Sequence, residues 1–185
     1  MDHGAGSYRR YLAGDEAAFD QLITEYFDGL LYFVNQYTQD LSAAEDIAID
    51  VFSDLIVHKH RYNFSVSMKT YLYMLGKSRA LNYLRRQQRQ KTVPMEQADS
   101  VADLHTPETV AFSNERKKAL YQAMSRLPQD QKTVVYLTYF EELSCDETAK
   151  VMGKNRKQVY NLLYRAKTAL RTIFAEEGVV LYENL

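Results

Sequence analysis

The sequence predicts an all-α protein made of two small helical domains joined by a flexible linker. Apolar residues recur at the i, i+3, i+4, i+7 spacing of helices in several separate stretches of the 185-residue chain. The stretch 91–109 interrupts this pattern because it is polar, lacks apolar periodicity and contains two prolines. No internal repeat and no β-type alternation stands out. We expect an N-terminal segment (1–13), a first domain (14–90), the linker (91–109), a second domain (110–175) and a tail (176–185).

The first domain begins with two predicted helices. Residues 1–13 are expected to be a ragged start with a short helix near 8–12. Asp15 is the expected cap of a long helix that ends near residue 37. Ser42 and Glu45 have the spacing of a capping box and are expected to open a second helix that ends near Val57.

A loop over 58–67 and a third helix from Met68 to about Gln90 complete the first domain. The loop contains His58 and His60, but no further ligand has metal-binding spacing with them, so solvated histidines are expected. Aromatic and basic residues alternate along the third helix. Such a helix can stack on exposed bases while it neutralises phosphates, although tyrosines in the core and solvated bases are the plainer alternative.

The second domain is expected to end in a helix-turn-helix. A helix with an apolar stripe stops at Pro128, which suits the first turn of the next helix, and that helix runs to about residue 140. Ser144 and Glu147 then form a capping box. Gly153 stands where the turn requires a positive φ, and Asn155 with Gln158 caps the second helix of the motif.

The second helix of this motif is amphipathic and basic. Its buried stripe is predicted from apolar residues at helical spacing between 159 and 173. Residues 154–171 include six Lys or Arg and no acid. Phosphates attract such a helix, and its N-terminal side chains reach base edges in a major groove. A solvated surface helix is the alternative. The candidate DNA contacts are Asn155, Arg156, Lys157, Gln158, Tyr160, Asn161, Tyr164 and Arg165.

Charge is sorted along the chain although the net charge is only −1. Residues 15–55 contain ten acids and no Lys or Arg, whereas residues 68–92 contain seven bases and no acid. This asymmetry suggests a basic partner for the front of the chain and nucleic acid for the rest. Four acids of the second helix are expected to face outward, as a docking face or as a solvated surface: Glu45, Asp46, Asp50 and Asp54.

Several function classes are disfavoured by the sequence. No Gly-rich phosphate loop, metal-ligand set or nucleophile–base pairing appears, so no enzyme, metal or cofactor is expected. Cys145 is the only cysteine, which fits a reducing cytoplasm, and a core position for it is favoured over a redox role. No apolar run is long enough to span a bilayer, so membrane insertion is not expected.

In order along the chain, these stretches resemble the extracytoplasmic-function sigma factors, the small promoter-recognition subunits of bacterial RNA polymerase. The front matches sigma region two through GDEAAFDQLITEYFDGLLYFV, AEDIAIDVFSDLI and TYLYMLGKSRALNYLRR. The back matches region four through LPQDQKTVVYLTYFEELSCDETAKVMGKNRKQVYNLLYRAKTALR. The resemblance implies core RNA polymerase and promoter DNA as partners. Family members are often held inactive by an anti-sigma factor, so the resemblance allows for such a partner too.

The resemblance also implies roles for individual segments. The acidic helix 45–54 would dock on a basic coiled coil of the polymerase clamp. The helix from Met68 would engage and melt the promoter element nearest the start site, the loop 60–67 would capture a flipped-out base, and the helix 156–167 would read the distal element. The region-two candidates are Lys69, Tyr71, Tyr73, Lys77, Ser78, Asn82, Arg85 and Arg86.

Four residues depart from the common family pattern. Ile49 stands where a polar Gln is common, Tyr71 replaces a common Trp, Ser78 a common Asn, and Leu162 a frequent basic residue. These departures leave the promoter sequence open. The alternative function is a helix-turn-helix DNA-binding regulator that acts without touching polymerase, and co-purification with core polymerase separates the two.

Overall fold

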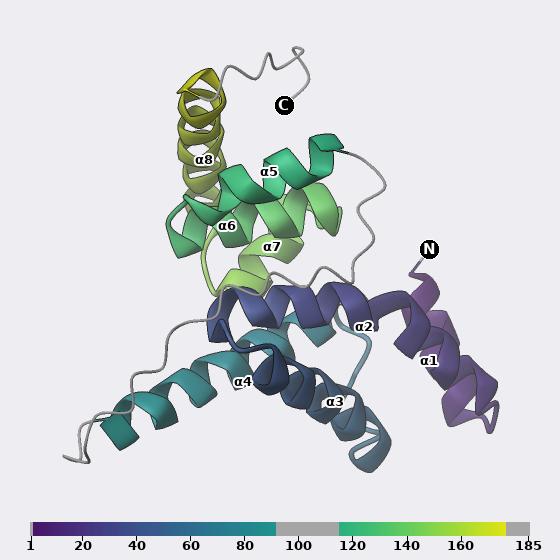
Figure 1. Cartoon of the computed structure of the whole chain (residues 1–185). Helices are drawn as coiled ribbons and strands as arrows, with labels where there is room; N and C mark the ends of the chain where they lie inside the picture. The colour runs from purple at the N-terminus through teal and green to yellow at the C-terminus, as the bar shows by residue number, and fades with distance from the viewer. Residues whose placement is uncertain (1, 92–114, 177–185) are drawn as a thin grey trace. The chain divides into compact units, whose positions relative to one another are not determined.

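A computed structural model describes residues 2–91 and 115–176, and every regular element in these ranges is helical. The chain divides into two compact units on either side of residue 108 (Figure 1). The expected linker 91–109 and tail 176–185 lie almost wholly outside the described residues. Each unit is described by itself below.

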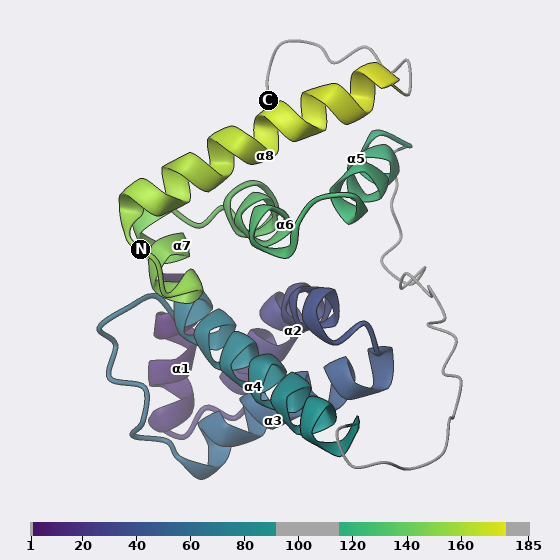
Figure 2. The same ribbon diagram turned by 90° about the vertical axis from the view of Figure 1, so that its left-hand side faces the viewer.

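The first unit contains four helices. They are α1 (His3–Leu12), α2 (Ala17–Thr38), α3 (Leu41–Val57) and α4 (Met68–Lys91). Helix α2 is central because it packs against α1, α3 and α4. Its buried side has the spacing of the predicted stripe, with Leu22, Leu30, Phe33 and Val34 fully buried. The unit is therefore a small bundle around α2 (Figures 1 and 2).

The N-terminal segment is ordered, and the expectation of a ragged start is wrong. Helix α1 begins at His3, where Asp2 is the N-cap and its carboxylate accepts a hydrogen bond from the Ala5 amide (3.2 Å). Tyr8 on this helix is fully buried. Gly4 lies so close to α4 that a Cβ atom there would stand 2.9 Å from Cβ of Met68. Helix α1 is thus an integral part of the first unit.

The caps of α2 and α3 differ in detail from the prediction. Helix α2 begins at Ala17, and the Asp15 carboxylate still accepts a hydrogen bond from the Ala18 amide (3.3 Å). The capping box expected at Ser42 is wrong, because Asp40 is the N-cap of α3 and accepts from the Ala43 amide (3.1 Å). Gln39 ends α2 with a φ of 51°. The N-cap of α3 therefore comes directly after Gln39, two residues earlier than predicted.

The second unit is built around its last helix. Its elements are α5 (Glu115–Ser125), α6 (Gln129–Val135), the π-helix η1 (Tyr136–Phe140), α7 (Cys145–Met152) and α8 (Arg156–Glu176). Helices α5, α6 and α7 all pack on α8, as Figure 2 shows. Pro128 is the N-cap of α6 rather than a first-turn residue. The helix predicted to reach residue 140 is present, with its last five residues in π-helical geometry.

Candidate docking and nucleic-acid interfaces

The acidic helix predicted for docking is α3, and three of its four candidate acids face outward. Glu45, Asp46 and Asp50 are exposed. Ile49, just before Asp50, and Ile56, near the end of the helix, are also exposed, at 53% and 46%. These isoleucines are seven residues apart and so lie on one side of the helix. The outer face of α3 therefore combines acids with two exposed apolar side chains.

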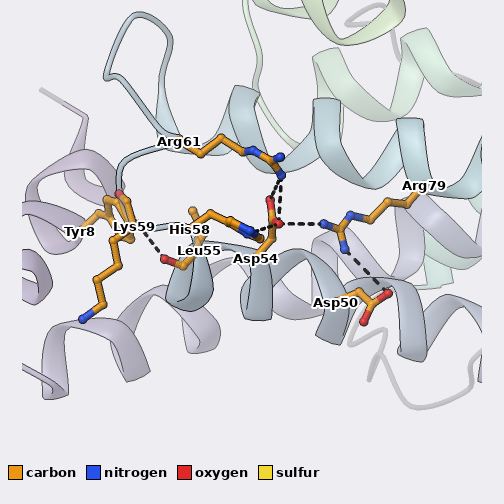
Figure 3. Close-up of polar contacts among 8 residues, drawn as sticks. All are labelled: Tyr8, Asp50, Asp54, Leu55, His58, Lys59, Arg61 and Arg79. Atoms are coloured by element: carbon orange, nitrogen blue, oxygen red, sulfur yellow. Dashed lines mark hydrogen bonds and ion pairs between the residues drawn. The ribbon is translucent and has the colours of Figure 1, made fainter.

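Asp54 does not belong to this face, and the expectation that it points outward is wrong. Its side chain is only 8% exposed and lies among three cationic or ring-nitrogen groups. Arg61 contacts both carboxylate oxygens (3.1 and 3.0 Å). His58 Nδ1 lies 2.9 Å from Oδ1, and Arg79 of α4 approaches Oδ1 to 3.4 Å. Figure 3 shows Asp54 at the centre of this cluster.

The cluster fixes the loop 58–67 and helix α4 to the end of α3. Burial raises the pKa of the Asp54 carboxyl, but hydrogen bonds from Arg61 and His58 and the charge of Arg79 outweigh burial and hold that pKa below its ordinary value. The carboxylate is thus charged and stabilised in the folded protein. Arg79 also approaches the exposed Asp50 (3.7 Å), so it links the buried and the outer acid of α3.

One side of helix α4 carries a stripe of aromatic, polar and basic side chains. Tyr71, Ser78, Asn82 and Arg85 follow one another at intervals of seven, four and three residues, which places them on one side of the helix. Ser78, Asn82 and Arg85 are exposed and Tyr71 is half-buried. The Arg85 guanidinium donates a hydrogen bond to Oδ1 of Asn82 (3.1 Å). Together with the exposed Arg86, these groups suit contacts to bases and phosphates.

Other α4 candidates lie away from this stripe. Tyr73 is fully buried, with its ring 5.0 Å from that of Phe33 on α2, so the expectation that Tyr73 projects from the helix is wrong. Lys69 and Lys77 are half-buried. The Lys69 ammonium lies 5.9 Å from the ring of Tyr26, which turns it toward α2. The predicted nucleic-acid surface of α4 therefore includes residues from two different sides of the helix.

The helix-turn-helix has the predicted local geometry. The Ser144 hydroxyl accepts from the Glu147 amide (3.3 Å) while the Glu147 carboxylate accepts from the Ser144 amide (3.0 Å), which completes the capping box. Gly153 ends α7 with a φ of 65°, a left-handed conformation that glycine adopts without strain. Lys154 in the turn pairs with Asp130 of α6 (3.0 Å). The turn is thus fixed by the conformation of Gly153 and by the ion pair between Lys154 and α6.

Asn155 and Gln158 form a reciprocal cap at the start of α8. The Gln158 amide donates to Oδ1 of Asn155, and the Asn155 amide donates to Oε1 of Gln158, both at 2.9 Å. This confirms their predicted capping role. Each side-chain oxygen accepts a backbone N–H of the cap, and the amide NH₂ groups of these two exposed residues are donors that the cap does not use.

The remaining candidates on α8 are exposed, as predicted. This set consists of Arg156, Lys157, Tyr160, Asn161, Tyr164 and Arg165. Tyr160 and Tyr164 are 49% and 74% exposed. The Arg156 guanidinium stacks over the Tyr160 ring (5.5 Å) and also approaches Asp146 of α7 (3.5 Å). The opposite side of α8 is buried through Val159, Ala166 and Leu170.

Neither a metal site nor a membrane helix is present in the described residues. Within 2–91 and 115–176 no group of three His, Cys, Asp or Glu side chains could hold a metal ion. No helix in these ranges is long and apolar enough to cross a membrane. His58 and His60 are both exposed, and the former contacts Asp54 rather than solvent alone. Cys145 is half-buried and has a free thiol.

Sequence reasoning missed three residues that organise the first unit. Arg79 joins α4 to α3, Tyr8 joins α1 to the end of α3, and Asp2 joins α1 to α4. Their partners are far away in the sequence, so no local pattern marks them. Asp54 did carry a signal, because it lies three residues after Val51 and seven after Ile47, on the buried stripe of α3.

Comparisons with known proteins agree with this architecture. Residues 22–90 match the family profile "Sigma-70 region 2", and residues 117–170 match "Sigma-70, region 4". Among solved structures, sigma factor RpoE of Bartonella quintana, in complex with the anti-sigma factor NepR, has a TM-score of 0.65 at 16% identity. The match covers 85% of this chain and 96% of that one. CnrH, in complex with the cytosolic domain of CnrY, has a TM-score of 0.61 at 16% identity and covers 94% of this chain and 96% of its own.

Curated relatives match over most of both lengths. ECF RNA polymerase sigma factor SigM of Bacillus subtilis is 24% identical over 155 residues, which cover 84% of this chain and 94% of SigM. RNA polymerase sigma-H factor of Pseudomonas aeruginosa is 26% identical over 170 residues, with 87% and 88% covered. The two family profiles, in this order and joined as in these relatives, establish that the chain belongs to the extracytoplasmic-function sigma factors of bacterial RNA polymerase.

Proposed function

We propose that this chain binds core RNA polymerase and directs promoter-specific, DNA-dependent initiation of transcription. The observation that carries the proposal is the different chemistry of three helical faces. The exposed face of α3 is acidic and apolar, whereas those of α4 and α8 are basic and aromatic. An ordinary DNA-binding regulator requires α8 but has no use for the acidic, apolar face of α3. We place the polymerase- and melting-related functions in residues 14–90 and the distal-element function in residues 110–175.

The proposed polymerase-docking face is the outer side of α3. Glu45, Asp46 and Asp50 supply charge that steers a basic partner, and Ile49 and Ile56 supply apolar area that is desolvated on contact. Ile49 therefore replaces the polar residue common in the family with a contact of a different kind. Asp54 supports this face from inside, through Arg79, rather than contacting the partner.

The proposed distal-element contacts lie on α8. Arg156, Lys157 and Arg165 are suited to phosphates, which fix the position of the helix on the duplex. Tyr160, Asn161 and Tyr164 are suited to base edges, through an amide and through aromatic contact with thymine methyl groups. Asn155 and Gln158 contribute by fixing the N-terminus of α8, with their NH₂ groups toward the backbone of the DNA.

The proposed contacts to the melted element lie on α4. Tyr71 offers a ring for stacking, Ser78 and Asn82 offer polar groups, and Arg85 and Arg86 offer charge. Lys69 and Lys77 lie away from this stripe at half-buried positions, and Tyr73 packs in the core. Stacking on Tyr71, together with these polar and charged contacts, offsets the unstacking cost of roughly a few kcal/mol per extruded base.

The protein acts as an initiation factor rather than as a catalyst, and it works in the cytoplasm, where polymerase and promoter DNA are found. No cofactor enters this function. The near-zero net charge predicts weak DNA binding by the free protein, because counterion release is the main sequence-independent driving force. An anti-sigma factor, as bound by RpoE of Bartonella quintana, is a further partner that this function would accommodate.

The test is run-off transcription with purified core polymerase over a genomic library, followed by start-site mapping. We expect the chain to convert core polymerase into a promoter-selective form. Asp50→Arg, which reverses charge at a 71% exposed side chain, is expected to weaken core binding by at least about tenfold in a pull-down.

The matched control is Asp28→Arg, the same charge reversal at an exposed residue of α2 in the same unit. Equal core binding by both variants would place the docking face elsewhere. Specific DNA binding by the free chain without any effect on polymerase would instead favour the regulator.

A further inference from the structure

Helix α1 contacts the start of the loop 58–67. The Tyr8 hydroxyl lies 2.8 Å from the Leu55 carbonyl oxygen and 3.0 Å from that of Lys59, so its proton is shared between the two (Figure 3). Leu55 belongs to the last turn of α3, where carbonyls lack partners within the helix. Tyr8 is fully buried, and burial raises the pKa of its hydroxyl to about 12, so it remains a donor at neutral pH.

Helix α1 also contacts the end of this loop. One oxygen of the Asp2 carboxylate accepts from the Ala5 amide (3.2 Å), and the other accepts from the Met68 amide (2.8 Å). A single carboxylate therefore caps the N-termini of both α1 and α4, where the helix dipoles favour negative charge. Both ends of the loop are thus fixed by residues of one helix.

The middle of the loop depends on α1 as well. Phe64 has a φ of 60°, an unusual backbone conformation for a bulky residue that persists only where neighbouring groups hold it. The Arg9 guanidinium lies over the Phe64 ring at 4.6 Å, and the Tyr62 ring lies 4.6 Å from it on another side. The Tyr8 ring supports both aromatics, at 5.8 Å from Tyr62 and 6.3 Å from Phe64.

The held loop has the chemistry of a surface for unpaired bases. Phe64 is half-exposed and lies beneath the exposed guanidinium of Arg9, and the loop also carries the exposed cations Lys59 and Arg61, the latter paired with Asp54. Aromatic rings beside cations bind single-stranded nucleic acid because the rings stack on bases while the cations neutralise phosphates. The family profile begins only at residue 22, so it assigns nothing to α1.

We propose that α1 is a positioning element for promoter opening, in which Tyr8 and Arg9 hold the loop 58–67 so that Phe64 is presented to the single strand. This inference rests on the proposed function. It assigns to residues 3–12 a positioning role in a step with which no sequence pattern associates them. Arg9 acts here through the ring of Phe64, which distinguishes it from a residue that merely adds positive charge.

The experiment compares Arg9→Ala with Arg10→Ala in the full chain. Both arginines are exposed and lie in the same turn, and each substitution removes one positive charge. Arg10, however, contacts Ser7, Gln21 and Asp15 rather than the loop. Amide hydrogen exchange of the loop is measured in the free protein. Core binding and permanganate reactivity of unpaired thymines are measured in the holoenzyme on a promoter found by start-site mapping. Tyr8→Phe, which keeps the ring but removes the hydroxyl, is the third variant.

We expect Arg9→Ala to speed loop exchange and to reduce promoter opening, each by about threefold to fivefold, with core binding unchanged. Arg10→Ala should alter neither quantity, and Tyr8→Phe should speed exchange at the start of the loop. Unchanged loop exchange in Arg9→Ala, or an equal loss of opening in Arg10→Ala, would overturn the inference. If the wild-type chain opened no promoter, the proposed function would fail, whereas the exchange data would still decide whether α1 holds the loop.

Discussion

The two units hold their functional side chains by different means. In the first unit, charged and polar groups are bound across helices that are distant in the sequence, as with Asp54 and Arg79 or Tyr8 and Leu55. In the second unit, both helices of the helix-turn-helix are capped by bonds between residues three apart, at Ser144–Glu147 and Asn155–Gln158, and one ion pair, Lys154–Asp130, joins the turn to α6. The candidate DNA contacts of α8 then project from a rigid helix into solvent.

This difference predicts how each unit responds to mutation. In the first unit, functional groups and structural contacts share residues, so removal of one side chain alters both the stability and the shape of the interface. In the second unit, the exposed side chains of Lys157, Asn161, Tyr164 and Arg165 take no part in the caps or in the buried stripe. Their removal should therefore change DNA binding while stability stays the same.

The largest effect on stability is expected from Asp54→Ala. Removal of the carboxylate leaves Arg61, His58 and Arg79 without their shared partner and opens a gap at the end of α3. We expect the free energy of unfolding of the first unit to fall by about 2–3 kcal/mol. Hydrogen exchange of α3 and α4 amides measures this loss.

Asp50→Ala is the control for this prediction, because Asp50 pairs with the same Arg79 from an exposed position. Its expected cost is below about 0.5 kcal/mol. The pH dependence provides a second check. Because the pKa of folded Asp54 lies below its ordinary value of 3.8, its contribution is complete above that pH and is lost as pH falls through the folded pKa. Wild type and Asp54→Ala should therefore converge in strongly acidic solution, and a constant difference would contradict the assignment.

A smaller effect is expected where α1 packs on α4. A Cβ at Gly4 would lie 2.9 Å from Cβ of Met68 and 2.6 Å from the Tyr26 hydroxyl, so Gly4→Ala must push the two helices apart. We expect a loss of about 1–2 kcal/mol in thermal or urea unfolding. Gly6→Ala, in the same helix, meets no atom within 4 Å and should stabilise by up to about 1 kcal/mol. Equal effects of the two substitutions would mean that α1 does not pack closely on α4.

The same contrast explains what the sequence could predict. The helix-turn-helix was predictable because its determinants are local: Ser144 with Glu147, Gly153 in the turn, and Asn155 with Gln158. The helices of the first unit were predictable from their apolar periodicity. Contacts between distant residues were not, because Tyr8 and Leu55 are 47 residues apart and Asp2 and Met68 are 66 apart.

Two wrong predictions, for Asp54 and for Tyr73, have a cause that lies within a single helix. All four acids are predicted from the sequence to lie on one outer face of α3, although the position of Asp54 relative to Ile47 and Val51 puts it on the buried stripe. Aromatic and basic residues were likewise grouped along α4, although Tyr73 lies on the side opposite Ser78. In both helices the residue types fit the predicted function. Which of these residues reach the surface depends on the angular position of each one around the helix axis.

The smallest effect on stability is expected from Lys157→Ala, which tests the second unit. Lys157 is exposed in the first turn of α8, so its loss should change the unfolding free energy by less than about 0.5 kcal/mol. If Lys157 contacts a phosphate, the slope of log affinity against log salt should fall by about 1 for holoenzyme on promoter DNA. Arg171→Ala is the control, since Arg171 is an exposed cation about 21 Å further along the same helix. An equal change in slope for both variants would mean that α8 attracts DNA only by its total charge, whereas a change for Lys157 alone places the N-terminal end of α8 at the duplex.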